Sequence, residues 1–300
     1  MLKKLLGVIR APFLLLVPAC LAPAFAIAWR HTGALDVTTS ALVIIAAFAA
    51  HIAVNALNEY EDFRSGLDFV TTRTPFSGGS GTLVAHAGFA PVALCVALAA
   101  LFITFSIGLY FAWQLGSAVV APGLIGLAII VAYTRWINRF PMMCLFAPGI
   151  GFGLLMVNLA VLVLTGRIYP ESLWASVAVT LLVSNLLLVN QLPDIEADKT
   201  AGRRHIAIAW GVMAAKVACP VLLVSAYLSV LLAWLAGIFP AVTLLALLTL
   251  PLAVFVAVKV KSFDPQEPQK FAPAQGANVV LTLLTPLLFA VGLFGSGQVA

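Results

Sequence analysis

Apolar and polar residues follow one another along this chain in long blocks, not at the short periods of a soluble fold. Nine windows of roughly 20 apolar residues each have the length that an α-helix needs to cross a bilayer. They cover residues 9–29, 37–58, 91–113, 117–134, 144–165, 172–193, 213–236, 240–260 and 274–295. We therefore predict an all-α polytopic membrane protein, with nine transmembrane helices in a single bundle around a central cavity.

Composition supports this interpretation, because 63% of the 300 residues are apolar and only 9% are charged. A soluble domain cannot hide so much apolar surface, and the windows lack the alternation typical of β-barrel strands. Two pairs of windows almost touch, across "WQLGS" and "AGIFP", and are predicted to be tight helical hairpins. The sequence thus predicts one transmembrane domain, 1–300, with two long polar cap loops near 59–90 and 194–212.

The basic residues predict the orientation of the chain. When successive windows cross in alternating directions, 14 of the 16 Lys and Arg residues fall on one side, and only Arg30 and Arg167 fall on the other. The positive-inside rule then places the N-terminus in the cytoplasm and the C-terminus outside, in the inner (plasma) membrane of the cell. The net charge of +5 reflects this topology. No basic groove with interleaved aromatic residues predicts nucleic-acid binding.

The N-terminal stretch "MLKKLLGVIRAPFLLLVPACLAPAFA" also has the form of a cleaved signal peptide, and "VPAC" resembles a lipoprotein cleavage site ending at Cys20. We favour its retention as the first span, because the apolar stretch continues to about Trp29. Cys20, Cys95, Cys144 and Cys219 stand alone in or beside apolar windows. They are predicted to be packing residues and not metal ligands or disulfide partners.

Most of the acidic residues gather in two clusters that follow the second and sixth windows, both on the predicted cytoplasmic side. Seven of the eleven belong to them, namely Glu59, Glu61, Asp62, Asp68, Asp194, Glu196 and Asp198. The clusters are four helices apart, which hints at a bundle with two equivalent halves that face each other. No wider sequence repeat accompanies this hint.

The first cluster, "NEYED", ends a polar stripe. His51, Asn55, Asn58 and Asp62 are spaced 4, 3 and 4 residues apart, so they share one face of a helix. Polar groups within a span face the bundle interior or a water-filled cavity. Gly66 is predicted to end this helix and to let Asp68 fold back toward the same point.

The second cluster, "NQLPDIEADKTAGRRH", repeats the arrangement. Asn190, Asp194 and Asp198 are spaced 4 and 4, which also predicts one helical face, and Pro193 is predicted to kink the sixth span inward. Each cluster thus offers two carboxylates and an amide oxygen, which are ligands that suit Mg²⁺ and not zinc. Two opposed clusters would hold two ions and clamp a diphosphate whose apolar tail enters the membrane. The alternative is that these acids are simply solvated at the membrane boundary.

Several cations lie near the clusters. Each of them either neutralises a diphosphate or only sets the topology. They are Arg73, Lys199, Arg203 and Arg204, with Arg135 and Arg139 after the fourth window. Tyr133 is a candidate site residue or an ordinary interfacial aromatic.

On these residues the chain resembles the UbiA-type intramembrane prenyltransferases, which join an isoprenoid diphosphate to an aromatic or other lipophilic acceptor. The family pattern N-D-Y-x-D-x-x-x-G-x-D is similar to "NEYEDFRSGLD", in which Glu59 replaces an Asp, and N-x-x-x-D-x-x-x-D is similar to "NQLPDIEAD". "YTRWINR" resembles the family's Tyr and basic residue after helix 4. Both motifs look most like the 1,4-dihydroxy-2-naphthoate branch of menaquinone synthesis.

The resemblance implies an Mg²⁺-dependent prenyltransferase that uses two ions, a prenyl diphosphate donor and an aromatic, quinone-precursor acceptor. It assigns metal binding to Asn58, Asp62, Asp68, Asn190, Asp194 and Asp198. It assigns diphosphate binding to Tyr133 and Arg139. From their place beside the clusters we add Arg73 and Lys199 as diphosphate contacts, and we predict that Asp62, Asp194, Arg73 and Lys199 are catalytic. His51 and Asn55 are candidate acceptor contacts, although His51 also suits a hydrogen bond between helices.

Three alternatives stay open at this point. A secondary transporter would place its binding residues near the bilayer midplane on broken helices, whereas these carboxylates lie at one surface. A CDP-alcohol phosphotransferase would carry a D-G-x-x-A-R motif, which this sequence lacks. The third alternative is prenyl transfer to an acceptor that is not a quinone precursor.

Overall fold

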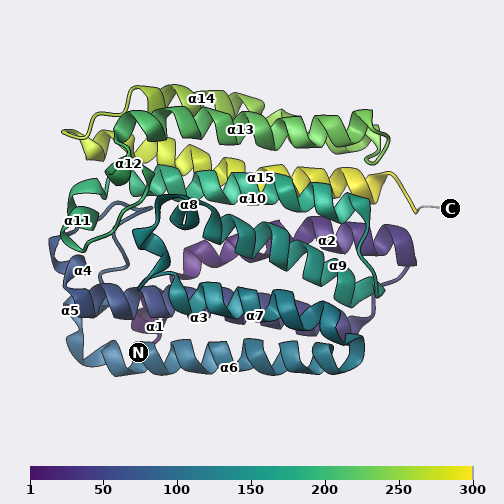
Figure 1. Ribbon diagram of the computed structural model, residues 1–300, viewed down its shortest axis with the longest axis horizontal. Helices are drawn as coiled ribbons and strands as arrows, with labels where there is room; N and C mark the ends of the chain where they lie inside the picture. The colour runs from purple at the N-terminus through teal and green to yellow at the C-terminus, as the bar shows by residue number, and fades with distance from the viewer. Residues whose placement is uncertain (299–300) are drawn as a thin grey trace.

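The long helices of the chain run side by side along one axis of the molecule, as Figure 1 shows for the computed structural model, which describes residues 1–298. Within these residues no strand is present. The long elements are α2 (Leu16–Thr32), α3 (Val37–Ser65), α6 (Ala90–Leu115), α7 (Ser117–Ala132), α8 (Pro141–Gly149), η4 (Ile150–Val157), α9 (Asn158–Thr165), α10 (Pro170–Gln191), α13 (Val212–Leu235), η5 (Ala241–Thr249), α14 (Leu250–Lys261) and α15 (Ala272–Gly295).

The remaining elements are short and connect these rods. They are α1 (Leu2–Val8), η1 (Ala11–Leu15), α4 (Leu67–Val70), α5 (Thr82–Ala85), η2 (Ala87–Phe89), η3 (Ile137–Arg139), α11 (Ile195–Thr200), α12 (Ile206–Ala209) and η6 (Pro268–Phe271). Figure 1 shows α4, α5, α11 and α12 together at the left end of the bundle, opposite the C-terminus. The two predicted cap loops therefore lie at the same end.

The all-helical fold class is confirmed, but the count of nine spans is not. In the described part of the chain, eight helices are long and apolar enough to cross a membrane. The predicted span 117–134 corresponds to α7, which has 16 residues. At 1.5 Å per residue α7 is about 24 Å long, which falls short of the ~30 Å hydrocarbon core.

Large apolar side chains on the outside of the bundle require a hydrocarbon environment. Phe102, Trp113 and Val254 are 69%, 83% and 61% exposed, and only 17% of the apolar window in α6 is buried. The predicted hairpin between α6 and α7 is confirmed, because only Gly116 separates the two helices. Four residues of the five-residue "AGIFP" connection lie between α13 and the Pro240 that precedes η5, which confirms the second hairpin.

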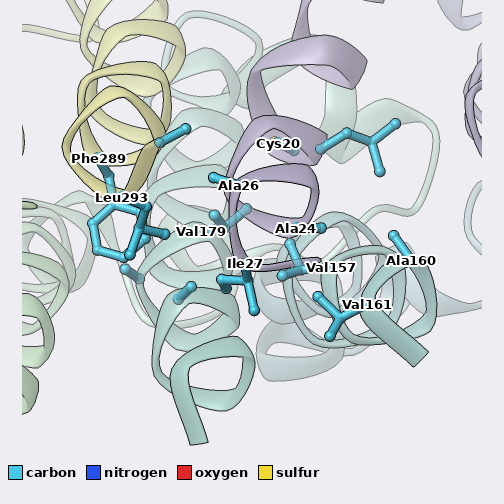
Figure 2. Packing of buried hydrophobic residues seen from close by; sticks show 14 of the residues in the cluster. Cys20, Ala24, Ala26, Ile27, Val157, Ala160, Val161, Val179, Phe289 and Leu293 are labelled. Carbon is cyan, nitrogen blue, oxygen red and sulfur yellow. The ribbon is translucent and has the colours of Figure 1, made fainter. Parts of the chain in front are cut away.

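The interior of the bundle is built from small side chains. Figure 2 shows Cys20, Ala24 and Ile27 of α2 packed among Val157 and residues of neighbouring helices. Small side chains such as alanine let the helices approach closely and make many dispersion contacts. Such contacts hold helices together in lipid, where the hydrophobic effect does not drive helix association. The four cysteines are unpaired, and Cys20 is fully buried in this cluster, as expected of a packing residue.

Two glycines, Gly149 at the end of α8 and Gly153 in η4, allow close packing against α10. A Cβ atom on Gly149 would lie 2.3 Å from the backbone oxygen of Thr180, and one on Gly153 would lie 2.5 Å from that of Ser176. Both distances are far below van der Waals contact, so only glycine fits at these two positions. The π-helix η4 is thereby set directly against α10. Its other face carries Phe152 and Met156 toward a cavity.

Candidate active site

A cavity of about 500 Å³ occupies the bundle between α3, α6, α7, η4 and α10. One end of the cavity is polar and is lined by both acidic clusters and by the loop residues Ser77, Gly78 and Gly79. The rest of the wall is apolar, with Phe105, Leu127 and other side chains of the same kind. The cavity thus joins a charged chamber at the helix ends to an apolar channel inside the bundle.

The first cluster is positioned by the end of α3. Asn58 Nδ2 donates a hydrogen bond of 3.0 Å to Asp62 Oδ2, as the four-residue spacing predicts. Gly66 ends the helix with φ 81°, a left-handed conformation that costs other residues energy, and this confirms the predicted helix end. The short helix α4 then turns Asp68 back, and its side chain is 3% exposed and lines the cavity.

The second cluster is not on one continuous helix, so that prediction is wrong. α10 ends at Gln191, a turn contains Pro193, and α11 begins at Ile195. Pro193 lacks an N–H and ends the helix instead of kinking it. The turn nevertheless keeps Asn190, Asp194 and Asp198 on the cavity wall.

Arg203 joins the two clusters. Its Nη1 lies 3.0 Å from Asp198 Oδ1, and its Nη2 forms an ion pair with Asp62 Oδ1. Burial alone would disfavour the charged guanidinium, but the two carboxylates outweigh it and raise the pKa of Arg203 above its ordinary value. The two acidic clusters therefore face one another across a shared chamber.

Other oxygens in this chamber have no partner. Asp68 Oδ2, Asn190 Oδ1 and Asp194 Oδ1 are buried and accept no hydrogen bond from the described residues. Burial, strengthened by the charges of Asp62 and Glu59, raises the pKa of Asp68 to about 7. Burial and the charge of Asp198 raise the pKa of Asp194 to about 7 as well. Buried oxygens without donors are a fit for a bound cation.

Glu59, the variant position of the first motif, points away from this chamber. Its Oε1 lies 2.7 Å from Arg10 Nε and 2.8 Å from the backbone nitrogen of Ser80, and its Oε2 accepts a 2.6 Å bond from Ser80 Oγ. The side chain is fully buried and does not line the cavity. Glu59 thus ties the N-terminal segment and the glycine-serine loop to α3.

Three of the predicted diphosphate contacts lie off the cavity wall. Arg73 is exposed and donates to the backbone oxygen of Asp68 at 2.8 Å, and Lys199 is paired with Glu196 at 2.7 Å. Arg139 is exposed and follows Asn138, which lines the cavity. Only Tyr133 of the four predicted residues lines the cavity.

His51 and Asn55, the candidate acceptor contacts, both line the cavity below the acidic chamber. The His51 ring meets Phe152 edge-on at a centroid distance of 4.8 Å, and its Nδ1 is buried without a partner. Asn55 Nδ2 donates to the backbone oxygen of Ile9 at 3.0 Å, which fixes the N-terminal segment to α3.

Sequence reasoning missed Arg10, and it named Arg203 only as one of several cations near the clusters. Spacing along the chain does not separate the nearby cations from one another, because the loops decide which of them turn inward. Each inward arginine contacts a fully or nearly fully buried acid, whereas the solvated Lys199 pairs with an exposed Glu196 three residues away.

Comparison with known proteins decides the family. Residues 15–281 match the family model described as the UbiA prenyltransferase family. The chain belongs to the UbiA prenyltransferase family. It is therefore a multi-pass membrane enzyme that transfers prenyl groups.

Two curated relatives bear the name 1,4-dihydroxy-2-naphthoate octaprenyltransferase. The one from Bacillus subtilis is 34% identical over 191 residues, which is 62% of this chain and only 58% of that relative's length. The one from Haemophilus influenzae is 27% identical over 270 residues, which cover 88% of this chain and 87% of the relative. Both likenesses agree with the branch that the motifs resemble.

Solved UbiA structures share the fold. A UbiA homolog from Aeropyrum pernix K1, in its apo form, matches with a TM-score of 0.69 and 19% identity, over 94% of this chain and 97% of that one. A homolog from Archaeoglobus fulgidus, solved with DMAPP and Mg²⁺, matches with a TM-score of 0.61 and 15% identity, over 96% and 99% of the two chains. These TM-scores show that the chains share one fold, a helical bundle.

The raised pKa values of this UbiA chain predict a pH dependence of its stability. Between about pH 4 and pH 7 the folded protein holds protons on Asp68 and Asp194 that the unfolded chain has released, since their ordinary pKa is 3.8. Stability in EDTA should therefore fall as the pH rises through this window. Tm measured in detergent from pH 5 to pH 8 tests this, and a Tm that does not fall would contradict it. Asp68→Asn together with Asp194→Asn should flatten the profile.

Proposed function

We propose that this enzyme moves an isoprenoid chain from a prenyl diphosphate to an aromatic quinone precursor of the 1,4-dihydroxy-2-naphthoate class, and that it depends on Mg²⁺. One observation carries the proposal: a single cavity presents opposed carboxylate clusters at one end and apolar walls beyond them. A charged head and a hydrocarbon tail match these two parts. The names of the two curated relatives support the acceptor class.

The donor set suits hard divalent cations. The residues that would hold them are the six predicted ones, which all line the chamber: Asn58, Asp62, Asp68, Asn190, Asp194 and Asp198. Their carboxylate and amide oxygens are typical Mg²⁺ ligands, and three of those oxygens are buried without a donor. When bound, Mg²⁺ supplies Lewis-acid stabilisation of the leaving diphosphate. We propose two ions, one for each cluster, as in our sequence prediction.

The protein's own residues orient and shield the substrates. The bond between the first carbon of the donor and its diphosphate oxygen breaks, and diphosphate leaves with the electron pair. The donor carbon bonds to an electron-rich ring carbon of the acceptor, which then loses the proton or the carboxyl group (as CO₂) that it carried. Arg203 and Arg10 supply positive charge at the chamber, where both line the wall. The apolar walls exclude water, which would otherwise capture the electron-poor carbon as an alcohol. His51 and Asn55 lie next to the chamber, in position to contact the acceptor.

A secondary transporter fits the site less well. The carboxylates lie at helix ends and in the cap loops, as the ends of α3 and α10 show. Transporter sites form near the bilayer midplane. The enzyme interpretation therefore accounts for the location of the charges.

A donor–acceptor panel tests the function. Membranes containing the protein are incubated with radiolabelled prenyl diphosphates of several lengths and with 1,4-dihydroxy-2-naphthoate, 4-hydroxybenzoate or a glyceryl phosphate. We expect a labelled lipid product with the naphthoate, and loss of that product in EDTA with recovery on added Mg²⁺. Product with the glyceryl phosphate alone, or equal product in EDTA, would contradict the proposal.

We also propose that the acidic chamber faces the cytoplasm. When the predicted windows alternate in direction, all but two of the 16 Lys and Arg residues fall on the same side as the acidic clusters. The positive-inside rule assigns that side to the cytoplasm. In intact cells a cysteine in place of the exposed Ser80 should resist an impermeant maleimide and should react after the membrane is opened. Labelling in intact cells would contradict the proposal and would show that the chamber faces the outside.

A further inference from the structure

We propose that Arg203 is a displaceable internal cation. In the metal-free protein it holds the two carboxylate clusters together, and it has to leave Asp62 and Asp198 before divalent ions can bind there. This inference rests on the proposed function, because it takes the acidic chamber as the metal site.

The contacts of Arg203 bridge two distant parts of the chain. Its two terminal nitrogens divide between Asp198, at 3.0 Å, and Asp62, which is 141 residues away in sequence. Both carboxylates are nearly inaccessible, at 3% and 5% exposure. The forked guanidinium thus fills the interval between two ligands that come from opposite clusters.

The chamber as it stands is not assembled for an ion. Among the described residues, no group of three or more His, Cys, Asp or Glu side chains is close enough to hold a metal. Asp62 bonds to Arg203 and Asn58, and Asp198 bonds to Arg203. His205 Nε2 lies 3.4 Å from Asp198 Oδ2 without a hydrogen bond. Metal binding therefore requires a rearrangement, and Arg203 is the group that bonds to both clusters.

The side chain can move while its backbone stays in place. The backbone nitrogen of Arg203 donates to the oxygen of Asp198 at 3.0 Å, and that of Arg204 donates to the oxygen of Asn138 at 2.9 Å. These two bonds fix the loop, so the motion is a rotamer change of a long side chain. Once released, the guanidinium remains at the chamber and can pair bidentately with a diphosphate.

Removing Arg203 should therefore have opposite effects on two ligands. Divalent ions no longer have to displace a bound cation. Their apparent affinity should therefore rise by the factor by which pairing of Arg203 with the two carboxylates lowers it in the wild type. A diphosphate loses a charged donor, so its affinity should fall. A variant that merely damages the fold would weaken both.

The test compares Arg203→Gln with Arg204→Gln, whose side chain is exposed, in the full chain purified in detergent. Mn²⁺ binding is measured by electron paramagnetic resonance without any diphosphate, and binding of inorganic pyrophosphate is measured in saturating Mg²⁺. For Arg203→Gln we expect Mn²⁺ binding to tighten about tenfold and pyrophosphate binding to weaken about tenfold. Its Tm in EDTA should also fall. Arg204→Gln should match the wild type in all three measurements.

Unchanged or weaker Mn²⁺ binding by Arg203→Gln overturns the proposal. If that variant does not fold, Arg203→Met replaces it, because methionine has a long apolar side chain and cannot bond to either carboxylate. The methionine variant must then bind Mn²⁺ more tightly than the wild type, and failure to do so overturns the proposal equally. A wild-type protein that binds no Mn²⁺ would instead refute the metal site itself.

Discussion

Asp194→Asn and Asp62→Asn are each expected to lower Mg²⁺-dependent prenyl transfer by about 100-fold or more, which is the usual loss when one preorganised electrostatic group is removed from an active site. Asparagine keeps the size and one oxygen of the side chain but loses the charge that a divalent cation requires. Both residues line the acidic chamber, one from each cluster. The measurement is product formation at saturating donor and acceptor over a range of Mg²⁺ concentrations.

The control for this prediction is Asp264→Asn. Asp264 is an exposed acid in the loop after α14, and its Oδ1 accepts only the backbone nitrogen of Gln266. The control should keep wild-type activity, and all three proteins should insert equally. Near-normal turnover by either chamber variant would rule out the proposed cation site.

The largest expected loss of stability comes from the buried pair of Arg10 and Glu59. Arg10→Met should leave Glu59, which is fully buried, with only the two bonds from Ser80. Removing one partner of such a pair costs about 3 kcal/mol, which corresponds to a fall in Tm of about 6 °C for a chain of this size. The measurement is the Tm in detergent with EDTA.

A second variant separates a structural role of Glu59 from a metal-binding role. Glu59→Gln removes the charge but keeps an acceptor for Ser80, so combining it with Arg10→Met should restore part of the lost Tm. Glu59→Gln alone should retain its Mg²⁺ dependence, because Glu59 does not line the chamber. Loss of Mg²⁺-dependent transfer at an unchanged Tm would show that Glu59 is a ligand after all.

The helices and their polar faces were predictable because they follow from local rules. Window length identified the spans, four-residue spacing placed Asn58 beside Asp62, and a glycine marked the end of α3. The shortness of α7 was less evident, since the predicted span 117–134 exceeds the helix Ser117–Ala132 by only Tyr133 and Thr134. Hydropathy measures composition and not where the backbone leaves the helix.

The loop residues could not be predicted in the same way. Whether Arg203 or Lys199 turns inward depends on how α11 is oriented against α4, which no local spacing encodes. The sequence predicts that Pro193 kinks a helix, whereas α10 ends at Gln191 and Pro193 lies in the turn before α11. Glu59 could not be separated from its motif neighbours, because its partners Arg10 and Ser80 come from segments 49 and 21 residues away.

The glycine contact between η4 and α10 has a consequence for substrate range. Since no side chain fits at Gly149 or Gly153, the cavity wall that bears Phe152 and Met156 packs tightly against α10, the helix that contains Asn190. The wall formed by α7 is packed less tightly, because among the described residues of this helix only Val119 is buried. Under the proposed function, relatives that accept longer or shorter lipid tails should differ mainly in the α6–α7 hairpin. Engineers who wish to change tail length should start there.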